Sequence, residues 1–304
     1  MNHTQKNPLL LFNGEHNDVA TDSFANALQS LGIQSGDTLF ISSRMYVVGR
    51  PNRSVTREIF LDSIIDLFFE AVGPEGTLIF PTYTSTFVAR KPFHLQNTPT
   101  QTGALNERFR QRYPLQRSSC PLASVVAVGK EVDFYTKNLS DSCFGEGSVF
   151  DRLRTKKDAK FIFIGGFVEF MTFAHHIECL MKVPYRYDKV FKGTIIDERL
   201  PEGQKEYQRD LIFFVRDLSF GADYDHGPMR DYLLEKGLLV QKQLGDSTIS
   251  MIRSLDLSNG ITELLKKDPF FLIRQTKEDW EKSAKDERPN YQLHQRAQAP
   301  QRSV

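Results

Sequence analysis

The sequence has few cysteines, a single tryptophan, no excess of charge and no long apolar run. Its three cysteines, Cys120, Cys143 and Cys179, form no Cys-x-x-Cys pair. Thiols this sparse and odd in number are typical of a reducing compartment, so we expect a cytoplasmic protein without a disulfide framework. No apolar run reaches the ~18 residues that suggest a membrane-spanning helix. The 39 basic and 38 acidic residues leave a net charge of +1, which argues against a dedicated nucleic-acid-binding or membrane-surface protein.

Two nucleotide-binding motifs are also missing. The sequence contains neither the G-x-G-x-x-G dinucleotide fingerprint nor the P-loop lysine pattern. A nicotinamide-dependent dehydrogenase and an NTPase are therefore disfavoured. The 304 residues suffice for one large α/β domain or two small ones.

Short apolar segments alternate with amphipathic segments along most of the chain. This alternation predicts the α/β class, with a single large domain around a mixed sheet and flanking helices. The expected strands cover residues 38–42, 77–80, 123–128 and 160–164, and residues 193–215 suggest an antiparallel excursion. The expected helices cover residues 21–31, 56–71, 104–112, 231–236 and 255–267.

Polar segments flank this domain. We expect a flexible N-terminus over residues 1–20, the folded domain over residues 21–273, and a polar, mobile and disordered tail over residues 274–304.

The segment with the clearest chemical content is T-F-A-H-H-I-E, residues 172–178. It follows an apolar run, residues 160–164, that ends in two glycines. Open α/β sheets tend to build their sites where such strands end. If the segment is a helix, His175 and Glu178 share one face. A carboxylate there can hold an imidazole in one tautomer and stabilise its protonated form, as a general base requires.

Two other interpretations of this segment stay open. Most His-x-x-Glu pairs on helices are solvated or structural. His176 is a second candidate base, but on a helix it points about 100° away from His175. His175, His176 and Glu178 could also supply three metal ligands. No further His, Cys or Asp cluster with ligand spacing lies nearby, so we expect no metal.

Several separated motifs occur in an order that resembles the aminoglycoside 3-N-acetyltransferase family. Together they extend over about residues 21–273. The motifs are L-G-I-Q-S-G-D-T-L-F-I-S-S (residues 31–43), V-G-P-E-G-T-L-I-F-P-T-Y-T (72–84), T-G-A-L (102–105), R-S-S-C-P-L-A-S-V (117–125), F-G-E-G-S (144–148), the segment 172–178, and D-L to D-P over residues 256–269.

The resemblance implies an enzyme, an N-acetyltransferase of the antibiotic-resistance type. It would transfer an acetyl group from acetyl-CoA to an amine of an amino sugar or aminoglycoside, by direct attack without a covalent intermediate. The family's base and its orienting carboxylate fall on His175 and Glu178. The resemblance further implies a small-molecule amine as partner and acetyl-CoA as co-substrate, and it leaves a homodimer open.

The remaining site residues follow from matched motif positions and from the need to polarise the thioester carbonyl. The cofactor-binding candidates are Ser42, Ser43, Arg117, Ser118 and Ser124. The candidates for contact with the substrate or the oxyanion are Thr82, Tyr83 and Thr172. The candidates for binding the CoA phosphates are Arg44, Arg50, Arg53, Arg117 and Lys156 or Lys157.

The chain departs from the family in its third motif. Resistance enzymes usually have R-S-x-H-P-x-H-S, whereas this chain has Cys120 and Ala123 in place of both histidines. This departure motivates a second hypothesis, a non-catalytic relative that binds CoA or a sugar. A third hypothesis is a metal-dependent hydrolase built on His175, His176 and Glu178.

Overall fold

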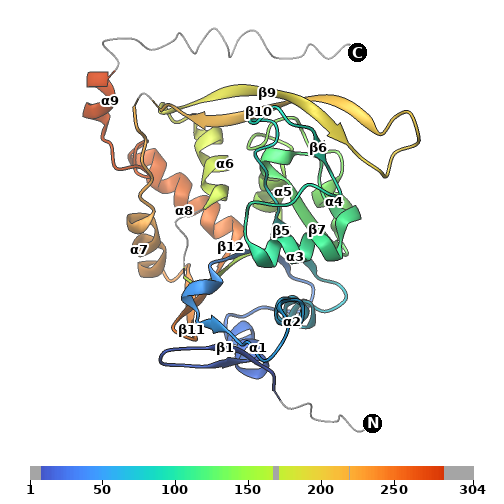
Figure 1. The fold of residues 1–304 in the computed structure, drawn as a ribbon. Coiled ribbons are helices and arrows are strands. Elements are labelled where there is room, and N and C mark those ends of the chain that lie inside the picture. Colours follow the sequence, from blue (N-terminus) through green and yellow to red (C-terminus); the bar gives the residue numbers. More distant parts are fainter. Residues whose placement is uncertain (1–7, 167–170, 219, 284–304) are drawn as a thin grey trace.

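The computed structural model describes residues 8–166, 171–218 and 220–283, and it has the predicted α/β architecture (Figure 1). A six-stranded mixed sheet forms the centre, in the order β11-β12-β8-β3-β5-β7. Strand β3 pairs in parallel with β5 and β8, whereas β7, β12 and β11 join as antiparallel strands. The strands are β3 (Thr38–Ser43), β5 (Thr77–Pro81), β7 (Val125–Gly129), β8 (Ala159–Ile164), β11 (Val240–Leu244) and β12 (Ser247–Arg253).

Side chains of the central strands alternate between two apolar cores, one on each face of the sheet. On β8, Phe161 and Phe163 join one core, and Ile162 and Ile164 join the other, as the period of a strand requires. Helices α1 (Thr21–Ser30), α2 (Arg57–Val72) and α3 (Ala104–Arg112) pack on the isoleucine side. Helices α4 (Val132–Thr136), α5 (Val149–Thr155), α6 (Thr172–Met181), α7 (Gly227–Glu235) and α8 (Ser254–Lys267) pack on the phenylalanine side.

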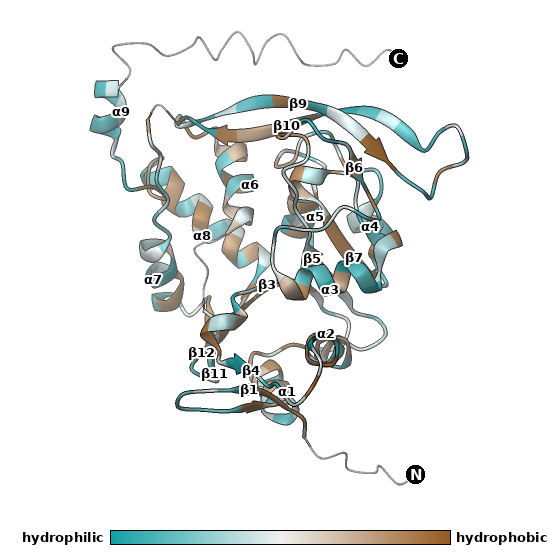
Figure 2. Cartoon of the chain, viewed as in Figure 1, coloured by the Kyte–Doolittle hydropathy of each residue, from teal (hydrophilic) through white to brown (hydrophobic). Residues whose placement is uncertain are grey.

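The helices follow from ordinary local signals. The Thr56 side chain caps α2 by accepting a hydrogen bond from the Ile59 N–H at 3.3 Å. The helix buries Phe60, Ile64 and Phe68, which recur every four residues. Helix α8 is similarly amphipathic, and Figure 2 shows apolar and polar residues along it. Short 3-10 helices cover Met45–Val47, Pro114–Gln116 and Pro121–Ala123.

A long β-hairpin lies over the end of the domain that carries α6 (Figure 1). Strands β9 (Arg186–Ile196) and β10 (Glu206–Arg216) pair antiparallel along their whole length, and β6 (Phe93–His94) extends them in parallel. This hairpin confirms the predicted antiparallel excursion, although it begins seven residues earlier than expected. Its early start places Arg186 beside α6.

Both terminal segments contain more regular structure than expected, because apolar side chains in them pack against the domain. Strands β1 (Leu10–Asn13) and β2 (Val19–Ala20) form a small sheet with β4 (Arg50–Pro51), so residues 8–20 are not the loose segment expected. The ring of Phe12 is buried 5.0 Å from that of Phe60, which explains the order. Within the expected tail, α9 (Lys277–Ser283) places Trp280 4.9 Å from Phe220. Residues 1–7 and 284–304 lie outside the described residues.

The hairpin of β11 and β12 was not predicted.

Over the described ranges of the chain, no helix has the length and apolar character to cross a membrane.

Candidate active site

The turn after β8 sets the position of helix α6, which carries the candidate site. Gly165 has φ +88°, and a Cβ there would lie 2.5 Å from the Arg44 carbonyl oxygen. Only glycine fits such a close approach with this backbone. The N–H groups of Gly165 and Gly166 both donate to the Thr248 carbonyl at 2.9 Å, which fixes the turn against β12. Helix α6 begins shortly afterwards, at Thr172.

His175 and Glu178 form the pair that their spacing on α6 predicts. His175 Nδ1 lies 2.8 Å from Glu178 Oε2. The Glu178 side chain is fully buried, whereas 19% of the His175 side chain is exposed. The protein therefore encloses Glu178 completely, whereas a small molecule can reach His175.

Two further side chains hold the Glu178 carboxylate. The Tyr185 hydroxyl donates to Oε1 at 2.7 Å, and Arg186 Nε makes an ion pair with Oε2 at 3.0 Å. Arg186 also donates to the Phe214 carbonyl on β10, and its Nη2 lies 3.1 Å from His175 Nδ1. The carboxylate thus has a partner for each oxygen, as a buried charge needs.

These contacts set the protonation states of the pair. Burial raises the pKa of Glu178, but Arg186, His175 and Tyr185 together outweigh it and leave that pKa below its usual value. Burial and then the Arg186 guanidinium lower the pKa of His175 to about 4, against the opposing effect of Glu178. At neutral pH the pair is a carboxylate beside a neutral imidazole.

The tautomer of His175 follows from these states. An ionised carboxylate only accepts, so Nδ1 carries the proton and donates it to Glu178. Nε2 then keeps its lone pair, and Arg186 Nη2 lies 3.5 Å from it, at the limit of a hydrogen bond. The rings of Phe144 and Tyr224 lie 5.4 and 5.2 Å from the imidazole and restrict its orientation. This arrangement suits a residue that accepts a proton at Nε2.

His176 has a different environment. It is fully buried, and its Nδ1 lies 2.6 Å from the Phe144 carbonyl oxygen. Its Nε2 is 3.8 Å from Asp151 Oδ1. These contacts join α6 to α5 and to the segment before it, and they leave His176 in a structural position.

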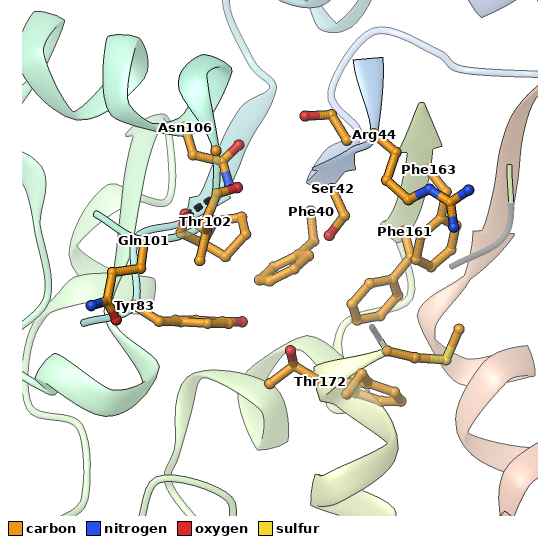
Figure 3. Close-up of a pocket in the computed structure, with 15 residues that line it drawn as sticks. Phe40, Ser42, Arg44, Tyr83, Gln101, Thr102, Asn106, Phe161, Phe163 and Thr172 are labelled. Carbon is orange, nitrogen blue, oxygen red and sulfur yellow. Dashed lines mark hydrogen bonds between the residues drawn. The ribbon is translucent and has the colours of Figure 1, made fainter. Parts of the chain in front are cut away.

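A pocket of about 440 Å³ opens where β3, β5 and β8 end, beside the first turn of α6 (Figure 3). Such a volume is typical of small-molecule sites. His175 does not line it but follows Thr172 by one helical turn on the same face. Of the predicted site residues, Ser42, Ser43, Tyr83 and Thr172 line this pocket together with Phe40, Arg44, Pro81, Gln101, Thr102, Gly103, Asn106, Phe161, Phe163, Met171 and Phe173.

The Tyr83 hydroxyl points toward Thr172 at one side of the pocket (Figure 3). Burial raises the pKa of Tyr83 well above its usual range, and the Thr172 hydroxyl only partly opposes this. The Tyr83 hydroxyl therefore keeps its proton and is available as a donor.

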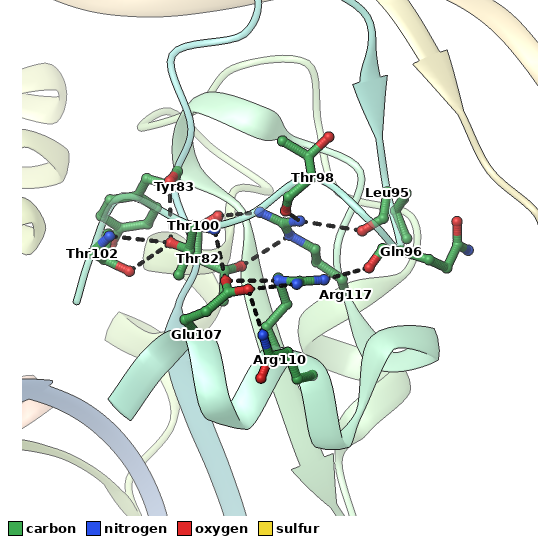
Figure 4. A network of polar contacts seen from close by, with 11 residues as sticks. Thr82, Tyr83, Leu95, Gln96, Thr98, Thr100, Thr102, Glu107, Arg110 and Arg117 are labelled. Carbon is green, nitrogen blue, oxygen red and sulfur yellow. Dashed lines mark hydrogen bonds and ion pairs between the residues drawn. The ribbon is translucent and has the colours of Figure 1, made fainter. Parts of the chain in front are cut away.

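The other predicted site residues are buried beside the pocket, and Figure 4 shows Arg117 and Thr82 in their network of polar contacts. Arg117 is fully buried and donates to the Thr82 and Thr98 carbonyls at 2.5 and 2.6 Å. The Ser124 hydroxyl donates to the Thr82 carbonyl, and the Ser118 hydroxyl accepts from the Val125 N–H at 3.0 Å. Burial lowers the pKa of Arg117 to about 9. The Thr82 hydroxyl accepts from Arg117 Nε at 3.2 Å, and these four side chains support the wall formed by the loop after β5.

The positions of the two missing histidines lie in the apolar core. Cys120 Sγ is 3.1 Å from Cys143 Sγ, and both thiols are buried and unbridged. Ala123 is also buried in this core.

Of the basic residues predicted to bind the CoA phosphates, Arg44 lies at the pocket, whereas Lys156 makes an ion pair with Glu131.

No three His, Cys, Asp or Glu side chains among residues 8–166, 171–218 and 220–283 are arranged to hold a metal ion. His175 and Glu178 contact each other, and His176 contacts a carbonyl. The metal-dependent hydrolase therefore finds no support in these contacts.

Comparison with known proteins gives the family. The model of the family described as aminoglycoside 3-N-acetyltransferase matches residues 43–266. The chain belongs to this family. It is 24% identical over 268 residues to aminoglycoside N(3)-acetyltransferase III of Pseudomonas aeruginosa, covering 79% of this chain and 91% of that protein.

Solved structures of the family share the fold. The binary complex of AAC-IIIb with CoASH superposes with a TM-score of 0.67 at 21% identity, covering 81% of this chain and 96% of that one. AAC-VIa bound to sisomicin gives the same TM-score and identity, covering 81% and 97%.

Sequence reasoning missed Tyr185, Arg186 and Tyr224. Tyr185 and Arg186 come soon after α6, and Lys182, the residue that follows the helix, has a left-handed conformation with φ +52°. The chain therefore turns back over the helix that it has just left. The only signal was Pro184, which ends helical structure and precedes an extended segment.

Proposed function

We propose that this protein transfers an acetyl group from acetyl-CoA to the amine of an amino sugar, with His175 as general base and Glu178 as its orienting partner. The observation that carries the proposal is the 2.8 Å contact between His175 Nδ1 and Glu178 Oε2 in a chain of this family. The contact leaves Nε2 as the atom that accepts a proton. The pocket one helical turn away offers room for the thioester.

The depressed pKa of His175 determines at which step the imidazole can accept a proton from the amine. An imidazole with a pKa of about 4 cannot deprotonate an ordinary alkylammonium ion at neutral pH. The amine therefore arrives neutral and attacks the thioester carbonyl, forming the C–N bond. Its nitrogen becomes positively charged and far more acidic, and His175 Nε2 accepts the proton. The C–S bond then breaks, and the CoA thiolate takes up that proton to leave as the thiol.

The oxygen of the tetrahedral adduct needs donors. The Tyr83 hydroxyl, which points toward Thr172 in the pocket, is one (Figure 3). The N–H groups of the first turn of α6 are others, because a helix N-terminus favours negative charge. Thr172 lies at this turn and can position the thioester.

The pocket suits the pantetheine arm of CoA. AAC-IIIb was solved with CoASH, which makes the same cofactor the natural candidate here. Phe161, Phe163 and Met171 offer apolar contact along the arm, and Ser42 and Ser43 can bond to its amides. Arg117, Ser118, Ser124 and Thr82 would act on the cofactor through the loop that they support.

The acceptor that we propose carries less positive charge than an aminoglycoside. AAC-VIa was solved with sisomicin, a polycation. Recognition of a polycation requires carboxylates, and among the described residues in contact with His175 the one carboxylate, Glu178, is buried and paired with Arg186. Glu178 balances the charge of Arg186, and Arg44 adds a further cation at the neighbouring pocket. A cell-envelope amino sugar fits this charge better.

The test follows release of CoA thiol from acetyl-CoA across a panel of amino sugars and aminoglycosides. His175→Gln should lower kcat by about 100-fold or more, because glutamine can bond to Glu178 but cannot accept the proton. The matched control is His94→Gln, since His94 is exposed on β6, and it should behave as wild type. Wild-type turnover in His175→Gln would end the assignment. Binding of CoA by calorimetry without release by any amine would favour the non-catalytic relative.

A further inference from the structure

A buried arginine stands against both members of the His175–Glu178 pair. Only 3% of the Arg186 side chain is exposed. Its Nε lies 3.0 Å from Glu178 Oε2, and its Nη2 lies 3.1 Å from His175 Nδ1. Nδ1 already donates its hydrogen to Glu178, so its contact with Arg186 is one of charge, whereas Nε2 can accept a long hydrogen bond from Arg186 Nη2 at 3.5 Å.

The position of Arg186 is fixed from three sides. It donates to the Phe214 carbonyl on the partner strand of the hairpin. The centre of its guanidinium lies 5.4 Å from the Tyr224 ring and 5.9 Å from the Phe214 ring, distances typical of cation–π contacts. The hairpin of β9 and β10 thus delivers one rigid cation to the base and its carboxylate.

We propose that Arg186 is a positioning residue that holds Glu178 against His175 and keeps the imidazole neutral until an attacking amine releases its proton. The inference rests on the proposed function for its catalytic meaning. Its electrostatic part does not depend on turnover. A cation beside an imidazole disfavours the imidazolium, whereas the carboxylate alone would favour it.

Other charged and titratable groups face this pair. Glu178 comes from α6 itself, and Tyr185 precedes β9. Arg216 on β10 stacks on Tyr224 at 5.7 Å and is a second cation near Arg186. His226 lowers the pKa of His175 in the same direction as Arg186, and Cys179 lies close enough to act on Arg186. Among these cations only Arg186 contacts both His175 and Glu178.

The experiment follows the imidazole by NMR titration of the histidine C–H protons, with the His175 signal assigned by its loss in His175→Gln. Arg186→Gln should raise the pKa of His175 by about one to three units. The acid limb of the pH–rate profile should move upward with it. Arg216→Gln, which removes a cation without direct contact to the pair, is the matched control and should shift the His175 pKa by less than half as much.

Arg186→Lys keeps the experiment decisive if the glutamine variant does not fold. A lysine can pair with Glu178 but offers no second nitrogen to the imidazole. We expect a His175 pKa between those of wild type and the glutamine variant, and kcat lower by about tenfold, because misplacement of a catalytic group is costly. An unchanged His175 pKa in folded Arg186→Gln, or wild-type pKa and kcat together in Arg186→Lys, would overturn the inference.

The two proposals fail separately. A raised His175 pKa in a protein that acetylates no amine would leave Arg186 with its electrostatic role and remove the proposed function. Acetyl transfer that is lost in His175→Gln, together with a His175 pKa that is the same in Arg186→Gln and wild type, would support the proposed function and remove the role of Arg186.

Discussion

Replacing His175 by glutamine should make folding less sensitive to acid. The folded protein holds the His175 pKa at about 4, against 6.5 in the unfolded chain. Between these values the unfolded chain binds the proton more readily, so the stability that the neutral imidazole contributes falls as pH falls. Linkage gives a loss of about 2 kcal/mol in the free energy of unfolding between about pH 7 and pH 5. His175→Gln removes this loss.

The assay is urea unfolding of wild type and His175→Gln at both pH values. The difference between their pH dependences isolates His175, because the other histidines titrate in both proteins. His94→Gln is the control and should lose stability on acidification as wild type does, since His94 is exposed. Equal pH dependences for wild type and His175→Gln would refute the argument that burial and Arg186 keep His175 neutral.

Two further predictions concern the scaffold around the site. Arg117→Leu should lower the free energy of unfolding by about 3 kcal/mol, because the Thr82 and Thr98 carbonyls lose their buried donor; a urea midpoint equal to that of wild type would contradict the network. Gly165→Ala should cost about 2 kcal/mol or more and reduce turnover, since φ +88° and the Arg44 carbonyl at 2.5 Å leave no room for a Cβ. Gly203→Ala, with φ +82° but open space, is its control and should cost less.

The sequence was sufficient for the central architecture because that part depends on local patterns. The apolar run at residues 160–164 and the amphipathic spacing of Phe60, Ile64 and Phe68 became β8 and α2. The spacing of three between His175 and Glu178 likewise predicted their contact, since a helix brings such residues together.

The rest of the site depends on contacts that no local pattern encodes. Arg186 reaches Glu178 only because the hairpin folds back over α6, and its place in the sequence is that of an ordinary strand residue. Arg117 matches a family motif, yet its burial beneath the loop after β5 follows from tertiary packing. The N-terminal strand β1 was missed because its four residues gain order only by pairing with β2 and β4.

The most direct test of the account is the identity of the product. Wild-type protein is incubated with acetyl-CoA and an amino sugar that has a single amine, and the sugar is then analysed by mass spectrometry. The account predicts an acetyl group on the sugar nitrogen with wild type and with His94→Gln, and none above background with His175→Gln. Thiol release without an acetylated sugar, or equal acetylation by His175→Gln, would contradict it.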